Sequence, residues 1–282
     1  MRIGVEVGGT FTDLVAIEDG KIRTVKVPST PDAPERGAFD ALRQWGGALA
    51  QVTDLAHGST VATNAILERK GARVCFLVTR GTRDLLYLQR HNRRNIYDLR
   101  YAKPVPVVSR RDTFEVTERL AADGSVVTAL DEQALKETLE TVRASGEFDA
   151  IAIAYLNSYA NPAHEQRTAL AVAEAGINLP VTCSHEVIPV FREYERYSTT
   201  ALSAYVQPVI GAYLQRFEQQ LNAEGFAGHF SVMQSNGGRL PANAMERNAI
   251  TSLFSGPAAG VVGATRQAGR SGYHDVITFD MG

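Results

Sequence analysis

The sequence predicts an α/β fold with a largely parallel sheet that begins with an antiparallel hairpin. Strand-like and helix-like segments alternate along most of the 282 residues, which is typical of parallel strands connected by helices. Asp19-Gly20 separates two apolar runs and predicts a two-residue hairpin turn. The hydrophobic content of 44% is sufficient for the core of one large domain or two ordinary domains.

Each expected strand is a short run of apolar or β-branched residues bounded by turn residues. The run RVCFLVTRG, residues 73–81, has the apolar centre of a strand that is covered on both faces. A further hairpin is expected around Asp123-Gly124. The expected strands are residues 3–7, 11–18, 21–27, 55–59, 73–81, 149–156, 180–187, 229–238 with its turn, and 275–280.

The expected helices are recognised by their start and stop signals. Pro34 stands near the first turn of one helix, Gly71 ends another, and Asp131 begins a third. The longest helix contains Pro208, which we expect to kink or divide it. The expected helices are residues 34–50, 60–71, 131–145, a segment from 162 onward, 192–222 and 255–269.

Charge and cysteine content exclude several classes of function. Lys and Arg number 29 and Asp and Glu number 31, so a net charge of −2 attracts neither nucleic acid nor an acidic membrane surface. No apolar run approaches membrane-spanning length, and no signal peptide is recognised. Cys75 and Cys183 are expected to be buried free thiols in a reducing compartment, although a disulfide is the alternative. We therefore predict a soluble, cytoplasmic protein.

The stretch GVEVGGTFTD, residues 4–13, carries the strongest chemical signal. Gly8 and Gly9 let the backbone approach an anion closely and adopt conformations that other residues avoid. Backbone N–H groups of this turn and the hydroxyl groups of Thr10 and Thr12 would form a phosphate cradle. The alternative is a plain hairpin with a diglycine turn.

Two carboxylates flank this turn. Glu6 ends the first strand and could hold Mg²⁺ directly or through water. Asp13 follows the turn and could orient a water molecule or supply a second metal ligand. The stretch is neither a Walker loop nor a dinucleotide-binding fingerprint, because the glycine-lysine and helix-opening patterns of those motifs are absent from it.

The strand–acid–x–glycine order recurs at the other end of the sequence. VITFDMG, residues 276–282, places Asp280 and Gly282 as Glu6 and Gly8 are placed in IGVEVGG, residues 3–9. A duplicated fold, in which two lobes each present a phosphate hairpin to one cleft, would produce this repetition.

Six motifs follow one another along the chain: GVEVGGTFTDLV, HGSTVATNAILERKGARVCFLVTRG, RRNIYDL, MQSNGG, SLFSGPAAGVVGA and TFDMG. In this order they resemble the hydantoinase/oxoprolinase family, specifically its A-type subunit, and the resemblance covers essentially the whole chain. It implies the actin, sugar-kinase and Hsp70 type of ATPase fold, which is ribonuclease H-like, with a complete first lobe and a truncated second lobe. It places the family's N-terminal domain at residues 1–185 and the start of its catalytic domain at 186–282.

The resemblance implies ATP-dependent opening of a cyclic amide, such as a hydantoin or 5-oxoproline, through a phosphorylated amide. ATP and Mg²⁺ are the implied cofactors, and Asp13 is the implied catalytic residue. Glu6 and Asp280 would be metal residues, although the family usually has aspartate where this chain has Glu6. The residues implied in nucleotide binding are Gly8, Gly9, Thr10, Phe11, Thr12, Asp280 and Gly282.

The family pattern continues beyond a motif like TFDMG into a second phosphate turn. We therefore expect this chain to be an N-terminal fragment that is inactive by itself. The implied partners are a small lactam or hydantoin substrate and a B-type hydantoinase subunit. Two alternatives remain: a subunit of an ATP-dependent acetone or acetophenone carboxylase, and a non-catalytic, actin-like nucleotide-binding module. The stretch RRNIYDLRYAKPVPVVSRR looks closer to hydantoinase-type members.

Three other segments are weaker candidates. His57, Thr60 and Asn64 surround a strand-to-helix junction that could contact substrate, although Ser59 or Thr60 could simply cap the helix. The basic run at 89–95 could meet a carboxylate or a partner subunit, or be a solvated loop. The run at 234–240 follows a strand and could bind a ligand or form a plain turn.

Overall fold

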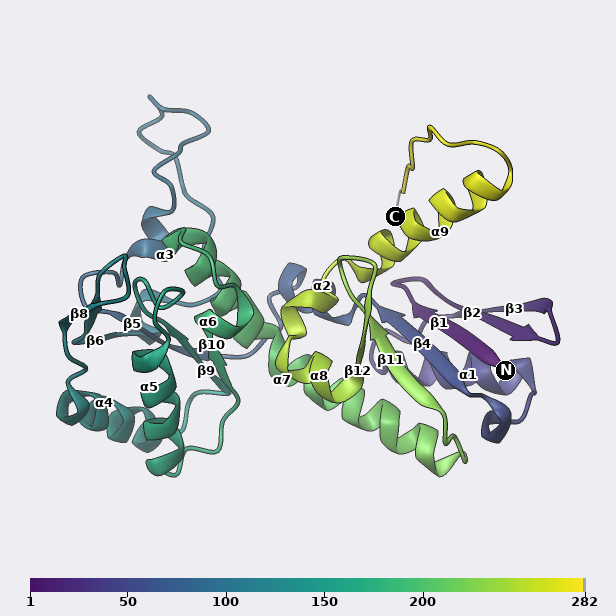
Figure 1. Cartoon of the computed structure of the whole chain (residues 1–282), viewed down its shortest axis with the longest axis horizontal. Coiled ribbons are helices and arrows are strands. Elements are labelled where there is room, and N and C mark those ends of the chain that lie inside the picture. The colour runs from purple at the N-terminus through teal and green to yellow at the C-terminus, as the bar shows by residue number, and fades with distance from the viewer. Residues whose placement is uncertain (281–282) are drawn as a thin grey trace. The chain divides into compact units, whose positions relative to one another are not determined.

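The computed structural model describes residues 1–280, and these divide into two compact units (Figure 1). Unit 1 combines Met1–Glu68 with the chain from Val209 onward, and unit 2 is Arg69–Pro208. Unit 2 is therefore an insertion between two parts of unit 1. The family-domain boundary expected at 185/186 is a different kind of division and stays a prediction.

Unit 1 is built on a six-stranded mixed sheet in the order β12-β11-β4-β1-β2-β3. Strands β1, β2 and β3 form consecutive antiparallel pairs, while β4 is parallel to β1 and β11 is parallel to β4. Asp19 (φ 47°) and Gly20 (φ 77°) form the turn between β2 and β3, as expected from their dipeptide. The strands are β1 Arg2–Val7, β2 Phe11–Glu18, β3 Lys21–Pro28, β4 Asp54–Ser59, β11 His229–Met233 and β12 Arg239–Pro241.

Helices pack on both faces of this sheet. The ring of Phe39 on α1 lies 5.1 Å from that of Phe217 on α7, and these two helices cover one face (Figure 1). Helix α9 lies on the opposite side, where its beginning packs on β4 and β11. The helices of unit 1 are α1 Pro34–Trp45, η1 Leu49–Gln51, α2 Val61–Leu67, the second half of α7 Glu193–Ala223, α8 Ala242–Arg247, η3 Ala249–Ser252 and α9 Ser255–Arg270.

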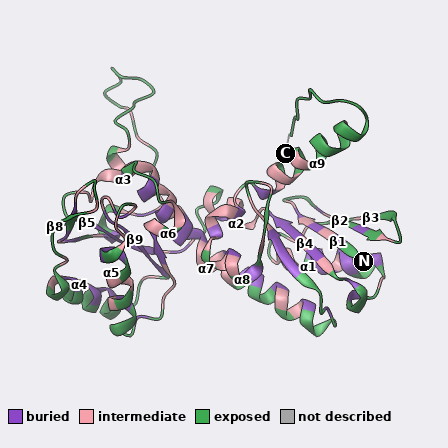
Figure 2. Ribbon diagram, in the orientation of Figure 1, coloured by how far each residue is buried: buried purple, intermediate pink, exposed green. Residues whose placement is uncertain are grey.

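Unit 2 contains a parallel sheet in the order β10-β9-β5-β6. Strands β5 and β9 are buried along their whole length, because helices and loops cover both faces (Figure 2). Asp131 caps α4 by accepting a hydrogen bond from the Ala134 N–H at 3.0 Å. The elements are β5 Val74–Thr79, α3 Leu85–Leu88, η2 Arg110–Asp112, β6 Thr113–Val116, β7 Arg119–Leu120, β8 Val126–Thr128, α4 Glu132–Ser145, β9 Ala150–Ala154, α5 Ala163–Glu174, β10 Val181–Cys183, α6 Ser184–Val187 and the first half of α7.

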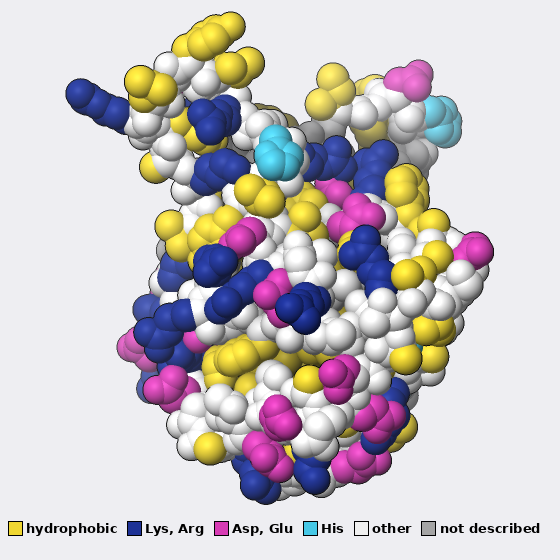
Figure 3. Space-filling view, turned by 90° about the vertical axis from the view of Figure 1, so that its left-hand side faces the viewer, with side chains coloured by type: hydrophobic (Ala, Val, Ile, Leu, Met, Phe, Trp, Pro, Cys, Tyr) yellow, Lys and Arg dark blue, Asp and Glu magenta, His cyan; other side chains and the backbone are white. Residues whose placement is uncertain are grey.

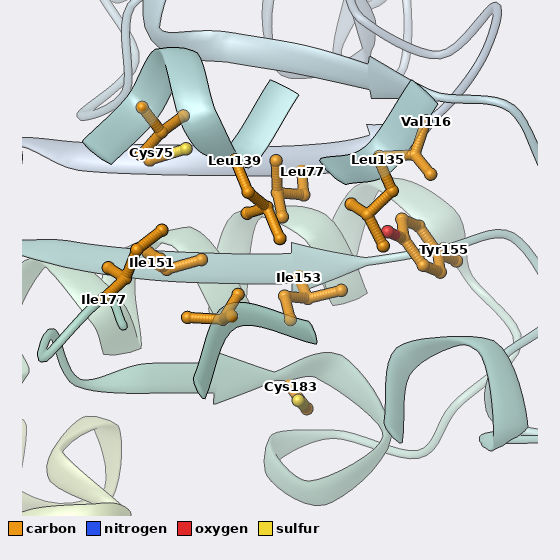
Figure 4. Packing of buried hydrophobic residues seen from close by; sticks show 12 residues of the cluster. Cys75, Leu77, Val116, Leu135, Leu139, Ile151, Ile153, Tyr155, Ile177 and Cys183 are labelled. Carbon is orange, nitrogen blue, oxygen red and sulfur yellow. The ribbon is translucent and has the colours of Figure 1, made fainter. Parts of the chain in front are cut away.

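The two cysteines are buried free thiols in the core of unit 2 (Figure 4). Cys75 lies on β5 and Cys183 on β10, and β9 separates these strands. Neighbouring strands lie about 4.8 Å apart, so the two Cα atoms are too far apart for a disulfide. The expectation of two unpaired thiols is confirmed.

Four expected elements differ from the structure. The strand expected at 180–187 ends at Cys183, and helix α6 begins at Ser184. The helix expected over 34–50 ends at Trp45, because Gly46 adopts a left-handed conformation and stops it. Helix α2 ends at Leu67, before Gly71. The strand expected at 275–280 does not form, since among residues 1–280 it has no pairing partner and the Ile277 side chain is 98% exposed. A β-rich sequence forms a strand when a neighbour accepts its hydrogen bonds.

The long helix α7 is continuous through Pro208. Within residues 1–280, no helix combines the length and the apolar character that crossing a bilayer requires.

Candidate active site at the carboxyl edge of the unit 1 sheet

Three parallel strands of unit 1 end at the same edge of the sheet. Glu6 of β1 pairs with Gly58 of β4, and Val232 of β11 pairs with His57 of β4. The loops that follow these strands therefore lie together, and this edge is where α/β sheets commonly bind ligands. These connections are residues 8–10, residue 60 and residues 234–238.

Hydrogen bonds to neighbouring residues fix the diglycine turn after β1 on one side, and its other side is not covered by protein atoms. The Gly8 N–H donates to the Phe11 carbonyl at 3.1 Å, and Ser29 Oγ donates to the Gly8 carbonyl at 2.7 Å. A Cβ atom at Gly8 would lie 3.0 Å from the Phe11 carbonyl oxygen, whereas one at Gly9 would meet nothing within 4 Å. Neither glycine has a positive φ. Gly8 is thus explained by the close approach of the Phe11 carbonyl, whereas Gly9 is bordered by open space, and neither glycine is required by an unusual backbone conformation.

Glu6 lies in a pocket made by two glycines. A Cβ atom at Gly58 would lie 1.8 Å from Glu6 Oε2, and one at Gly256 would lie 2.9 Å from Glu6 Oε1. Burial, and to a lesser extent the nearby Asp13 carboxylate, together raise the pKa of the Glu6 carboxyl to about 7. A cation or a hydrogen-bond donor beside this carboxyl group would reverse that shift.

Asp13 stands directly across the strand pair from Glu6 and is itself paired with Lys26. The register places Glu6 opposite Asp13 and Asp13 opposite Lys26. Lys26 Nζ lies 2.7 Å from Asp13 Oδ1 and 2.9 Å from Oδ2, and both side chains are about half exposed. The result is a row of two acids and one base on one face of the sheet.

The beginning of α9 adds a second polar feature on the Glu6 side. Ser255 is the first residue of this helix and is buried, and within residues 1–280 its Oγ has no hydrogen-bond partner. Gly256, the next residue, borders the Glu6 carboxyl group. The start of a helix carries free N–H groups and favours negative charge.

Thr12 faces away from these acids. Its side chain is buried on the α1 face of the sheet, and its hydroxyl group lies 3.0 Å from Ser29 Oγ. Because Ser29 Oγ donates to the Gly8 carbonyl, the Thr12 hydroxyl donates to Ser29. Alternation along β2 puts positions 12 and 13 on opposite faces, so Thr12 supports the turn from behind. Thr10 and Phe11 are exposed at the turn.

His57 is a core residue and its ring does not reach a ligand site. It is 0% exposed, Nδ1 donates to the Val5 carbonyl at 3.1 Å, and Nε2 lies 2.8 Å from the Tyr213 hydroxyl. Burial lowers the His57 pKa to about 4, although the bond to Val5 opposes the shift. Because Tyr213 and Phe217 of α7 pack against the ring, this arrangement argues against direct substrate contact by His57, and the substrate role stays a prediction.

The other predicted positions are more exposed. Thr60 and Asn64 are half-buried and bond to each other, with 3.3 Å between Asn64 Nδ2 and Thr60 Oγ1. The 234–238 segment is a turn in which the Gln234 N–H donates to the Gly238 carbonyl at 2.9 Å. Asp280 is exposed outside any regular element, and Gly282 lies outside the described residues.

The basic run at 89–95 belongs to an exposed loop of unit 2 that follows α3. Figure 3 shows Lys and Arg side chains spread over one face of the molecule and interspersed with Asp and Glu. Arg90 pairs with Glu195, also in unit 2.

Lys26, Gly58 and Gly256 belong to this site but escaped the sequence analysis. Lys26 could have been found, because a two-residue turn at Asp19-Gly20 pairs position 13 with position 26. Nothing local to Gly58 or Gly256 indicates that both border Glu6, since that contact depends on how β4 and α9 pack.

Comparison with known proteins decides the family of this chain. The hydantoinase/oxoprolinase N-terminal region matches residues 2–176, and the hydantoinase/oxoprolinase region matches residues 196–282. The chain belongs to the hydantoinase/oxoprolinase family.

Named relatives within this family include ATP-dependent enzymes. The caprolactamase subunit alpha of Pseudomonas jessenii is 35% identical over 293 residues, which cover 100% of this chain and 42% of the relative. The crystal structure of the ATP-dependent caprolactamase from that organism matches with a TM-score of 0.89 at 33% identity, covering 100% of this chain and 42% of that one. The 5-oxoprolinase 1 of Arabidopsis thaliana is 31% identical over 318 residues, or 100% of this chain and 25% of the relative.

A carboxylase shares the same architecture. The nucleotide-free structure of acetone carboxylase, from work on ATP-dependent acetone carboxylation, matches with a TM-score of 0.84 at 29% identity. The match covers 97% of this chain and 41% of that one. The chain thus spans about two fifths of the length of the caprolactamase subunit and one quarter of the length of the plant oxoprolinase.

Proposed function

We propose that this chain supplies a phosphate-binding part of an ATP-dependent cyclic-amide hydrolase. The observation that carries the proposal is the Glu6–Asp13 carboxylate pair beside the open Gly8–Gly9 turn, at the carboxyl edge of the sheet. Its relatives include ATP-dependent caprolactamase and 5-oxoprolinase, which supports an amide substrate.

The residues present fit both a nucleotide phosphate and Mg²⁺. The space outside Gly9 is free for a phosphate oxygen, and Glu6 is a partly buried carboxyl group beside a second carboxylate, Asp13, a pairing that a divalent cation would stabilise. Glu6 would hold Mg²⁺ directly or through water, with Asp13 contributing beside it. When bound, the metal would neutralise phosphate charge. Asp280 and Gly282 stay predictions for the second phosphate turn.

The reaction needs mainly positioning. An amide carbon is a poor electrophile, and transfer of the γ-phosphoryl group from ATP to the lactam oxygen releases ADP and makes that carbon reactive toward water. The ring C–N bond then breaks, and phosphate leaves. In this scheme the Gly8–Gly9 backbone holds phosphate oxygens, and Asp13 accepts a hydrogen bond that orients the reacting group.

Gly9→Ala is expected to weaken nucleotide binding without loss of stability. The new methyl group meets no protein atom within 4 Å, so the melting temperature should change little, while a phosphate that approaches Gly9 would be displaced. Titration calorimetry should show an affinity for ATP lower by about tenfold, equivalent to about 1.4 kcal/mol. Gly211→Ala, at an equally open position on α7, is the control and should leave the affinity unchanged. Unaltered binding by the Gly9 variant would remove this turn from the phosphate site.

The substrate class is tested by ADP release. The intact enzyme, with its partner subunit if one is required, is incubated with ATP and Mg²⁺ plus hydantoin, 5-oxoproline, caprolactam, or acetone with bicarbonate. We expect ADP to be released when a cyclic amide is present, together with formation of the ring-opened product. Release only with acetone and bicarbonate would instead establish the carboxylase function, which the match to acetone carboxylase favours. Nucleotide binding without turnover would favour a non-catalytic module.

Further features follow from the same proposal. The strand order β11-β4-β1-β2-β3, in which β1 pairs antiparallel with β2 and β2 with β3, supports the actin-like, ribonuclease H-like ATPase fold. We propose residues 1–185 and 186–282 as its family domains, and a B-type subunit as its partner, since caprolactamase has an alpha subunit. Two unpaired thiols fit a cytoplasmic location.

A further inference from the structure

A buried arginine in unit 2 has an unused hydrogen-bonding edge. Arg196, near the start of α7, is 0% exposed. Its Nη1 donates to Ser158 Oγ and, at 3.2 Å, to Ser184 Oγ. Among residues 1–280, its Nε and Nη2 have no hydrogen-bond partner. Leaving buried N–H groups of a charged side chain unpaired is costly, so the arrangement requires an explanation.

The two serines place this arginine at the carboxyl edge of the parallel sheet. Ser158 follows β9, and Ser184 follows β10, the next strand in the sheet. Their hydroxyl oxygens lie 3.0 Å apart. As in unit 1, the carboxyl ends of parallel strands are a common place for a ligand.

Hydrogen-bond directions show that the serines have no donor left. Ser184 Oγ lies 2.5 Å from Glu165 Oε1, and an ionised carboxylate only accepts, so the Ser184 hydrogen points to Glu165. Ser158 therefore donates to Ser184, and both oxygens accept from Arg196. The free donors of this network are the Nε–H and Nη2–H groups.

Glu165 cannot use these donors. Its Oε1 also accepts from the Tyr155 N–H at 2.9 Å, and its Oε2 accepts from the backbone N–H and Nδ1 of His185 at 3.0 and 2.6 Å. This saturation also argues against a metal site, although donor atoms of Glu165, Cys183 and His185 lie within 4.8 Å of one another. Burial raises the pKa of the Cys183 thiol, which keeps it protonated.

The free edge has the shape of a carboxylate receptor. In a planar guanidinium group, Nε–H and one Nη–H point the same way and match the two oxygens of a carboxylate. The rings of Tyr159 and Tyr197 lie 5.6 and 5.9 Å from Arg196 Cζ and flank it. We propose that Arg196 binds a small carboxylate through Nε and Nη2, so that unit 2 holds a ligand site of its own. Because Arg196 is 0% exposed, a ligand reaches this edge only through a local opening of unit 2.

This site is tested by arginine-selective NMR. The chain is labelled with ¹⁵N-arginine and titrated with sodium acetate or sodium bicarbonate, with sodium chloride at matched ionic strength. One Nε–H resonance, identified by its loss in Arg196→Lys, should shift and saturate with a carboxylate but not with chloride. The anion that saturates at the lower concentration distinguishes an organic acid from bicarbonate.

Arg196→Lys keeps the charge but loses the two-donor edge, so its affinity for the same anion, followed by the shifts of backbone amides around residue 196, should fall by about 10- to 100-fold. Arg143→Lys, on α4 of the same unit, is the matched control and should bind as the unaltered chain does. The absence of a saturable shift, or equal affinity in Arg196→Lys, overturns the proposal. If Arg196→Lys does not fold, the resonance is identified by its slow solvent exchange, and the titration of the unaltered chain decides.

Discussion

Asp13→Asn is expected to lower the kcat of the intact enzyme by about two to four orders of magnitude, with KM and melting temperature nearly unchanged. This expectation rests on the proposed role of Asp13 beside the phosphates. The side chain is about half exposed and its pairing with Lys26 is a surface ion pair, which contributes about 0–1 kcal/mol to stability. Removing its charge therefore affects the transition state more than the fold.

Lys26→Met separates the catalytic role from the structural one. This variant breaks the same ion pair but keeps the Asp13 carboxylate. If Asp13 is only structural, both variants should lower the melting temperature alike and change kcat modestly. If it acts in the reaction, the Asp13 variant should lose far more activity. Steady-state kinetics and thermal unfolding of both proteins decide, and a stable Asp13→Asn enzyme with near-normal kcat would exclude the proposed role.

Glu6→Gln is expected to stabilise the metal-free protein at alkaline pH. The Glu6 pKa is about 7 in the folded chain against an ordinary value of 4.5, chiefly because of burial. Between these pH values the folded state keeps a proton that the unfolded chain has lost. The free energy of unfolding therefore falls as pH rises from about 4.5 to 7 and stays low above pH 7. The total decrease in the free energy of unfolding is about 3 kcal/mol at most.

Urea unfolding at pH 5 and pH 8 measures this effect. The stability gained by Glu6→Gln over the unaltered protein should be small at pH 5 and largest at pH 8. Adding Mg²⁺ at pH 8 should raise the stability of the unaltered protein and have little effect on the variant, if Glu6 holds the metal. Glu140→Gln, at an exposed position on α4, is the control. An equal gain at both pH values would contradict the buried environment of Glu6.

The sequence by itself was sufficient for the hairpin part of the site. Asp19-Gly20 determines a two-residue turn, and that turn places Asp13 opposite Lys26 through strand pairing. Gly8-Gly9 likewise marks the turn after β1. These features are local, because turn chemistry and alternation act over a few residues. The expected strand at 275–280 shows the limit, since its β-rich residues lack a neighbouring strand among those described.

Only the tertiary structure decided which polar residues face a ligand. His57 and Glu6 lie on adjacent strands, yet α7 encloses the His57 ring, whereas Gly58 and Gly256 leave space for the Glu6 carboxyl group. The unused edge of Arg196 depends in the same way on two serines from separate strand ends. Such contacts join segments far apart in the chain, and their burial and charge depend on packing that no local pattern encodes.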